Sequence, residues 1–324
     1  MRNNITRAIL GSVALITLLV LLPFIFSRYY LDLSIVFLIN LILAVSFRLI
    51  TTTGDFSLAH VPLMGMGAYT GAIMTKKLAL PFLLTMPLAG LVATLVGLVM
   101  LYPLIRMKEF AFFIGSYAIG EALRLSWVRL SIFGGHRGIS NISSPTISIP
   151  GLFTADFSEV VPYYFLTLAV TLVCLLCMYL LDRSRITEIF KAIHDEPDLV
   201  KSVGVNTTGY RILAFEVGTF FAGIAGVLVA HHMGHIDPHQ YELTTGLYLL
   251  IWIVVGGYAT FLGPIIGVTF FAIFGEWMRV FGAWMPLVYG CILIVTLLFL
   301  PDGLESLPRR LSFLFKRADA RTES

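Results

Sequence analysis

Long runs of apolar residues, separated by short polar stretches, recur along the whole chain. An α-helix needs ~20 mostly apolar residues to cross a bilayer. The predicted spans are approximately residues 8–26, 33–50, 57–75, 80–102, 109–125, 160–181, 211–230, 243–262, 263–281 and 284–300. The runs do not alternate between apolar and polar positions, as the strands of a membrane barrel do. The pattern therefore predicts an all-α, polytopic membrane protein with about ten transmembrane helices.

The composition agrees with this prediction. Of the 324 residues, 58% are hydrophobic and 13% are charged, which would leave far too much apolar surface exposed in water. The predicted spans use most of the chain and leave only short loops and tails. We therefore expect residues 1–324 to form a single transmembrane domain, with no room for a soluble catalytic domain.

The basic residues predict how the chain is oriented. Cytoplasmic loops carry an excess of Lys and Arg, and most of the 22 basic residues lie on one side if residues 183–210 are cytoplasmic. The same assignment places both termini and a C-terminal tail, residues 301–324, in the cytoplasm. Residues 231–242 contain no Lys or Arg and are expected to lie outside.

Polar residues interrupt the apolar pattern near residues 54–71. Irregular backbone at membrane depth is tolerated where it is buried in protein or lines a wet cavity. The polar residues and Pro62 therefore predict a broken or re-entrant helix that forms a wall of the solute pathway. The candidate pathway residues in this stretch are Asp55, Ser57 and His60.

The cytoplasmic stretch 183–210 carries a second signal. An apolar stripe ends one helix, and Pro197 disfavours helical geometry at the residue before it. A second helix is predicted to begin with Asp195 as its cap and to end at Gly204, too short to be stable alone. Either it docks on a partner surface or the loop folds back on its own spans. The residues expected to make the partner contact are Asp195, Glu196, Pro197, Leu199, Val200, Val203 and Gly204.

Two acidic residues lie inside predicted spans. A carboxylate at the bilayer centre costs ~2.5–3.5 kcal/mol on insertion scales, so each should face protein or water. Glu121 has Arg124 three residues further on, and the two can form either a structural pair or part of the pathway. Glu216 has no such partner nearby, so we expect a role in the solute pathway.

Four histidines and two cysteines were considered as metal ligands. The spacing of His231, His235 and His239 would place them on one face of a helix, but Pro238 argues against a helix that reaches so far. His232 adjoins them, and the sequence favours an external loop over a metal site. The Cys-x-x-Cys at Cys174 and Cys177 lies in an apolar run and is interpreted as helix packing.

Several separated motifs match the sequence pattern of one protein family. A family motif, Gly-x-x-Ser-Leu-x-His followed by a Gly-rich helix, is matched by Gly54, Ser57, Leu58, His60, Gly65, Gly67, Ala68 and Tyr69. Further matches, in the family's order, are Lys191-Ala192-Ile193, Gly204-Val205-Asn206, Leu213-Ala214-Phe215, Ala222-Gly223-Ile224-Ala225-Gly226, Gly256-Gly257, Gly263-Pro264-Ile265-Ile266-Gly267 and Leu300-Pro301-Asp302-Gly303-Leu304.

Together these motifs resemble the permease subunits of branched-chain-amino-acid ATP-binding-cassette (ABC) importers. The resemblance implies a permease of the bacterial inner membrane that is not itself an enzyme. Its implied partners are a homologous permease, two cytoplasmic ATPases, a periplasmic substrate-binding protein and the lipid bilayer, with no nucleic acid. No cofactor is expected on this chain, since ATP would bind the partner ATPase, on which residues 195–204 would sit as a coupling helix. The implied solute is a branched-chain amino acid, urea or a short amide.

Two departures from the family pattern affect the expected chemistry. The family usually has Gln where Asp55 stands, and Arg-Glu-Asn-like residues where His194, Asp195 and Glu196 stand. An alternative is an ion-coupled secondary transporter that uses Glu216 and Asp55. Its coupling carboxylates would replace the need for a partner ATPase.

Overall fold

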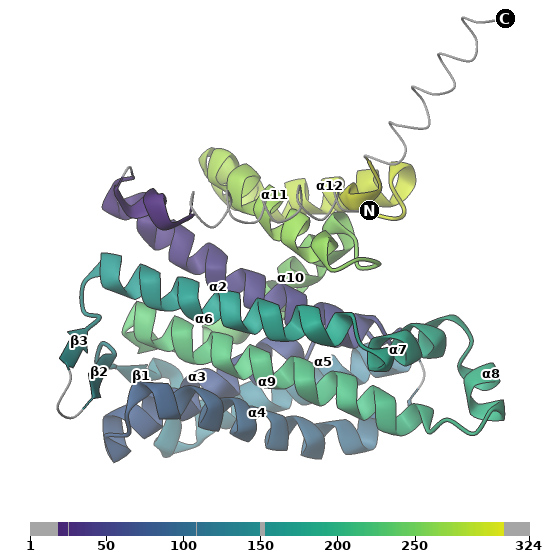
Figure 1. Ribbon diagram of the computed structural model, residues 1–324, viewed down its shortest axis with the longest axis horizontal. Coiled ribbons are helices and arrows are strands. Elements are labelled where there is room, and N and C mark those ends of the chain that lie inside the picture. Colours follow the sequence, from purple (N-terminus) through teal and green to yellow (C-terminus); the bar gives the residue numbers. More distant parts are fainter. Residues whose placement is uncertain (1–18, 25, 108, 150–152, 308–324) are drawn as a thin grey trace, which may run out of the picture.

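The computed structural model describes residues 19–24, 26–107, 109–149 and 153–307. Most of the first predicted span, residues 8–26, and most of the tail 301–324 lie outside the described residues. The described chain is a bundle of helices, most of which run along one common direction (Figure 1). The α-helices are α2 (Arg28–Thr51), α3 (His60–Leu78), α4 (Phe82–Leu104), α5 (Glu109–Arg129), α6 (Val160–Asp182), α7 (Arg185–Asp195), α8 (Pro197–Ser202), α9 (Thr207–Met233), α10 (Leu243–Gly256), α11 (Leu262–Met278) and α12 (Met285–Phe299).

Short elements outside the bundle make the fold slightly less purely helical than predicted. Strand β1 (Ile139–Ser140) pairs antiparallel with β4 (His235–Ile236), and β2 (Thr146–Ile149) pairs antiparallel with β3 (Phe153–Asp156). The remaining elements are the 3₁₀ turns η1 (Ser131–Phe133), η2 (Gly135–Arg137), η3 (Pro238–Tyr241), η4 (Arg279–Trp284) and η5 (Leu304–Ser306).

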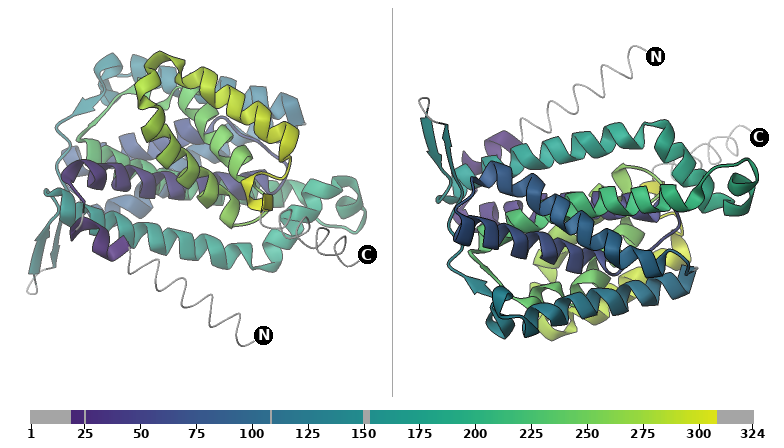
Figure 2. Two further views of the ribbon diagram at one scale, coloured as in Figure 1. Left: turned by 90° about the horizontal axis from the view of Figure 1, so that it is seen from above. Right: turned by 90° about the horizontal axis from the view of Figure 1, so that it is seen from below.

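The centre of the bundle is α9, which packs against α2, α3 and α4. Small residues allow this close packing: a Cβ added at Gly67 of α3 would collide with the backbone of Gly223 in α9. A Cβ at Gly71, one turn further along α3, would lie 2.9 Å from the Val227 side chain. The stripe of small residues therefore sets how near the two helices come. Helix α2 lies between α4 on one side and helices α10 to α12 on the other (Figures 1 and 2).

Helices lie at the predicted spans that the structure describes, but α3 and α5 are not among the helices that are long and apolar enough to cross a membrane, and two predicted spans change. Helices α2, α4, α6 and α9 are long and apolar enough to cross a membrane, and α10, α11 and α12 are shorter apolar helices. The predicted span 243–262 ends early because the chain turns at Gly257, whose φ of +106° favours glycine. The break expected within 54–71 precedes the helix instead. Helix α3 is continuous from His60, with Pro62 in its first turn, where proline is tolerated.

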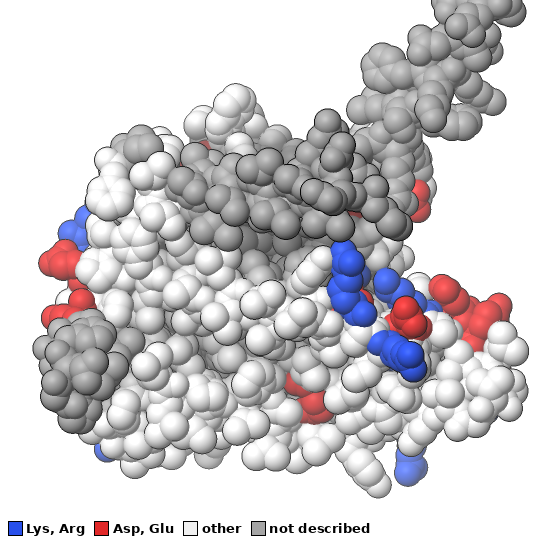
Figure 3. Space-filling view, viewed as in Figure 1, with Lys and Arg blue, Asp and Glu red and all other residues white. Residues whose placement is uncertain are grey.

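The two ends of the bundle differ. The hairpin of β2 and β3 lies at one end, and α7 and α8 lie at the other (Figure 1). On the face shown in Figure 3, the charged side chains gather mainly at these two ends, and uncharged atoms cover most of the middle. This separation is typical of a protein whose middle lies in a bilayer.

A buried arginine holds the end of the bundle that carries α7 and α8. Arg48, in the last turn of α2, is 0% exposed. Its Nη1 donates to Oδ1 of Asp182 at the end of α6 at 2.7 Å. Its Nε and Nη2 donate to the backbone carbonyls of Tyr258 and Ala259 at 3.1 and 3.2 Å. One side chain therefore joins α2, α6 and the connection between α10 and α11.

Replacing Arg48 with Met should destabilise the bundle strongly. The change keeps much of the side-chain bulk but leaves the Asp182 carboxylate without its ion pair, and breaking a buried pair costs ~3–5 kcal/mol. The measurement is thermal unfolding of the detergent-solubilised chain. Arg279→Met, which removes an exposed ion pair with Glu276, is the control and should change the midpoint little. Equal shifts in the two variants would show that the Arg48 contacts do not hold the fold.

The orientation can be tested with two single cysteines in a variant whose own cysteines are replaced by serine. His239 and Ser202 lie exposed at opposite ends of the bundle. We expect His239→Cys to react with an impermeant maleimide added outside intact cells, and Ser202→Cys to react only after the cells are opened. Labelling of both from the same side would contradict the predicted topology.

Candidate solute pathway and coupling surface

The largest of the described cavities opens near the end of the bundle that carries α7 and α8. Its volume is about 880 Å³. Residues from six helices and from the stretch between α2 and α3 line it: Thr53, Gly54, Asp55, Phe56, Phe110, Phe113, Ile193, His194, Pro197, Asp198, Lys201, Arg211, Leu250, Val254, Leu293 and Leu297. Asp55 is the one predicted pathway residue that reaches this cavity.

Asp55 forms a bidentate ion pair with Arg211 in the cavity wall. Nε of Arg211 donates to its Oδ2 at 2.6 Å, and Nη2 donates to its Oδ1 at 2.5 Å. The backbone turns at Gly54, which has a φ of +88°, and brings Asp55 against the first turns of α9. That helix begins where Asn206 accepts a hydrogen bond from the Gly209 amide at 3.0 Å. Arg211 was not foreseen from the sequence, since 156 residues separate it from Asp55.

Ser57 and His60 lie behind the cavity wall. His60 is buried, and its Nε2 lies 3.0 Å from Oγ of Ser46 in α2. Its ring packs against Phe47 with the centroids 5.2 Å apart. Oγ of Ser57 has no hydrogen-bond partner among the described residues. His60 therefore helps to pack α2 against α3, and neither side chain lines the cavity.

A second charged cluster lies at the opposite end of the bundle. The predicted pair is present: Nε of Arg124 donates to Oε2 of Glu121 at 2.9 Å, and Nη2 donates to Oε1 at 2.5 Å. Glu242, which the sequence analysis did not single out, lies 3.6 Å from Nη1 of Arg124. Its Oε1 lies 2.6 Å from Nδ1 of His239. The cluster links the end of α5 to the start of α10.

Glu216 differs from the other acidic residues. It lies in α9, and both of its carboxylate oxygens are buried without a hydrogen-bond partner among the described residues. This agrees with the expectation that no partner stands nearby in sequence. Glu216 lines none of the described cavities, so the structure does not bring it together with Asp55.

The coupling segment folds as two helices, but its cap differs from the prediction. Helix α7 continues to Asp195, and the amide of Glu196 donates to the carbonyl of Ala192 at 3.0 Å. Glu196, whose backbone leaves the helical region before the proline (φ −146°, ψ 77°), is therefore the residue that precedes α8, with Pro197 in the first turn. Helix α8 ends at Ser202, and Gly204 follows with a φ of +84°.

The apolar residues of this segment face two ways. Leu199 is 64% exposed and Val203 is 72% exposed, whereas Val200 is only 9% exposed. Val200 therefore packs against its own chain, contrary to the prediction that all three face a partner. The surface available to a partner consists of Leu199 and Val203.

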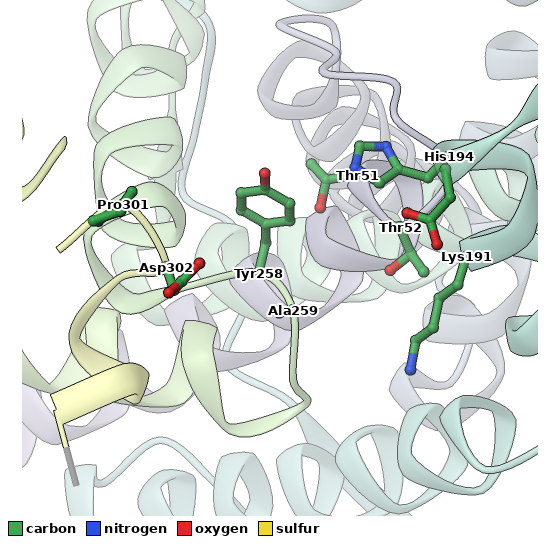
Figure 4. Close-up of a pocket in the computed structure, with 9 residues that line it drawn as sticks. Thr51, Thr52, Lys191, His194, Tyr258, Ala259, Pro301 and Asp302 are labelled. Carbon is green, nitrogen blue, oxygen red and sulfur yellow. The ribbon is translucent and has the colours of Figure 1, made fainter. Parts of the chain in front are cut away.

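A smaller cavity of about 350 Å³ separates α7 from the connection between α10 and α11. Figure 4 shows Lys191 and His194 of α7 on one side, with Thr51 and Thr52 at the end of α2. Tyr258 and Asp302 lie on the other side. The coupling segment therefore adjoins the start of the predicted C-terminal tail.

The four histidines of the suspected cluster have separate contacts. His231 Nε2 lies 3.2 Å from Oγ1 of Thr75, and the ring of His232 stacks on Tyr163. His235 Nδ1 lies 3.0 Å from Oγ of Ser140, and His239 contacts Glu242. No group of three or more possible metal ligands occurs within the described ranges. The cysteines described in the structure are free.

A tyrosine near these histidines has its pKa raised. The Tyr241 side chain is buried in η3 against Trp127, with ring centroids 5.7 Å apart. Burial disfavours the phenolate and therefore raises the pKa of Tyr241 well above its usual range. The side chain stays a neutral hydroxyl and acts as packing at this end of the bundle.

Apolar helices around a partly polar cavity are the architecture of a multi-pass membrane transport protein. Residues 29–300 match the family described as the permease component of branched-chain amino acid transport systems. The chain belongs to this family. It is the permease component of an ABC importer of that type and not itself an enzyme, and no cofactor is expected on such a chain.

Individual relatives agree with this assignment. The chain is 25% identical over 316 residues to the high-affinity branched-chain amino acid transport permease protein LivM of Salmonella typhimurium, covering 91% of this chain and 74% of the relative. It is 25% identical to LivM of Escherichia coli, covering 92% and 75%. It is 24% identical to the permease protein BraD of Pseudomonas aeruginosa, covering 79% and 87%. No solved structure matches the chain.

Replacing Glu216 with Gln should lower solute uptake without loss of the folded chain. Glu216 has no hydrogen-bond partner in the described part of the chain, so the prediction is that its carboxylate contacts the solute during transport. Losing such a contact, worth about 1.4 kcal/mol, would lower uptake by about tenfold. The measurement is uptake by the assembled transporter, with the amount of permease in the membrane determined in parallel. Glu159→Gln, at the exposed start of α6, is the control. Loss of the permease from the membrane would show instead that Glu216 is structural.

Proposed function

We propose that this chain is one of two permease subunits that together form the membrane path of a bacterial ABC importer for branched-chain or similar small amino acids. It would pair with a homologous permease, two cytoplasmic ATPases and a periplasmic binding protein in the inner membrane. The family match over residues 29–300 carries this proposal. Relatives named as branched-chain amino acid permeases support the solute class.

Energy would reach the permease through a protein contact. The sequence contains no G-x-x-x-x-G-K-[ST] phosphate-binding loop. The exposed pair Leu199 and Val203 presents an apolar surface at the end rich in basic residues, outside the predicted spans. Such a surface is best buried in the groove of a cytoplasmic partner. We assign this contact to the ATPase, with Asp195, Glu196, Pro197 and Gly204 shaping the helix that presents it.

The solute path would use the face formed by α5, α10 and α12. The Asp55 and Arg211 pair lies at the cytoplasmic end of this face, and the cluster of Glu121 and Arg124 lies at the outer end. Ser57 and His60 would support the first pair from behind. Both termini, including the tail 301–324, would be cytoplasmic.

The alternative of a secondary transporter coupled through Asp55 and Glu216 is less favourable. Asp55 is held by two hydrogen bonds from Arg211, so ion binding would have to break a charge-assisted pair. Glu216 lies in α9, away from the cavity. Two coupling carboxylates are therefore not brought together.

Replacing Leu199 with Asp should uncouple the permease from its ATPase. The charge would enter the centre of an apolar contact, and such central residues contribute about 2 kcal/mol or more, which is roughly thirtyfold in affinity. We expect loss of ATPase co-purification and of ATP-driven uptake, while the permease still inserts. Val203→Asp should act likewise.

Two further variants make this test specific. Val200→Asp buries a charge within the chain and should reduce the amount of folded permease. Thr208→Asp adds the same charge at an exposed site in the first turn of α9 and should leave coupling intact. Normal uptake and normal ATPase binding in both Leu199→Asp and Val203→Asp would show that α8 is not the coupling helix.

A further inference from the structure

The geometry points to a solute-binding site within this permease: the 880 Å³ cavity binds a zwitterionic α-amino acid with an apolar side chain. Arg211 would hold the ligand carboxylate and Asp55 would hold its ammonium group. The inference rests on the proposed function and deepens it, because it selects amino acids over urea and short amides. Arg211 becomes a specificity-determining residue of the transporter.

The cavity has a charged side and an apolar side. Two acidic residues, Asp55 and Asp198, and two basic residues, Lys201 and Arg211, line it, so these groups balance in charge. They come from the connection between α2 and α3 and from α8 and α9. Helices α5, α10 and α12 contribute the apolar side: Phe110, Phe113, Leu250, Val254, Leu293 and Leu297. A balanced polar side favours a zwitterion over an anion or a cation, and the apolar side suits a hydrocarbon side chain.

The ion pair has the geometry that such a ligand needs. The planar guanidinium of Arg211 donates two hydrogen bonds to the two carboxylate oxygens of Asp55, and the carboxylate of an amino acid can accept the same two bonds. The Asp55 oxygens, once released, accept from the ligand ammonium group. Asp55 is buried and Arg211 is partly buried. Each charge then exchanges one partner for another, so neither is left unpaired, which would be costly.

A neutral solute cannot make this exchange. Urea or a short amide carries no charge to replace either partner, so Asp55 and Arg211 would stay bound to each other. A carboxylic acid without an amine, or an amine without a carboxylate, would satisfy only one of the two and leave the other unpaired in the cavity wall. The site therefore requires both charges on one ligand.

The site also adjoins the coupling helix. Pro197, Asp198 and Lys201 of α8 belong to the cavity lining. A shift of α8 on its ATPase would therefore change the polar side of the cavity directly. Such a position is suited to releasing the ligand into the cytoplasm.

The test measures protection of a cysteine placed in the apolar wall. In the full-length chain, purified with its partner subunits and with its own cysteines replaced by serine, Val254→Cys is modified with N-ethylmaleimide. We expect L-leucine to slow this reaction at least tenfold at saturation. At the same concentration 3-methylbutylamine, 4-methylpentanoate and urea should not, because losing one charged contact weakens binding by about tenfold or more.

A charge-neutral variant gives the matched comparison. Asp55→Asn combined with Arg211→Gln removes both charges together, so no unpaired charge is left in the wall. Protection by L-leucine should disappear. Glu276→Gln with Arg279→Gln, an exposed pair away from the cavity, should leave it unchanged. Even if the neutral variant does not fold, the comparison of the four compounds on the protein with Asp55 and Arg211 intact tests whether the cavity is the binding site.

The outcomes separate this site from the proposed function. The cavity would not be the proposed binding site if all four compounds protected equally, if L-leucine gave no protection, or if its protection survived in the neutral variant. Leucine uptake by the unmutated complex is measured in parallel. Uptake without protection would reject the site and leave the proposed function standing. Protection without uptake would support the site and reject the proposed function.

Discussion

Ion pairs between largely buried arginine and carboxylate groups organise the end of the molecule that carries α7 and α8, because a buried charge that loses its partner is costly. Arg48 is fully buried, and its guanidinium donates hydrogen bonds to Asp182 and to two backbone carbonyls of the connection between α10 and α11. Close by, the Glu305 carboxylate accepts a hydrogen bond from the Thr260 hydroxyl of the same connection, and Arg211 holds Asp55. Polar contacts thus join helices that meet elsewhere through apolar packing, and these contacts frame both the cavity and the coupling segment.

The same arrangement supports the proposal that a partner protein drives this permease, whose sequence contains no G-x-x-x-x-G-K-[ST] loop. Leu199 of α8 and Val203, which follows the helix, are exposed, whereas Pro197, Asp198 and Lys201 of α8 line the cavity that holds Asp55 and Arg211. A force applied at the exposed side therefore needs to travel only across one short helix. The close packing of α9 on α3 through Gly67 and Gly223 leaves little room for movement at the centre of the bundle. A conformational change is therefore expected at the end that carries α7 and α8.

Local patterns in the sequence predicted most of the helices and the Glu121 and Arg124 pair, because a spacing of three residues decides that contact within one helix. The pattern could not predict Arg48 with Asp182 or Asp55 with Arg211, whose partners are 134 and 156 residues apart. It also gave the wrong cap for α8, and it predicted that Val200 faces a partner although the side chain is buried within the chain. Both depend on one turn of backbone around Pro197 and on packing against the rest of the chain, which no periodicity encodes.

The most direct test of the account is solute uptake into vesicles that contain the assembled transporter. We expect L-leucine to accumulate against its gradient only when ATP is present on the α8 side and the binding protein on the opposite side. Dissipating the proton and sodium gradients should leave accumulation unchanged. Accumulation driven by an ion gradient in the absence of ATP would contradict the account and identify the chain as a secondary transporter.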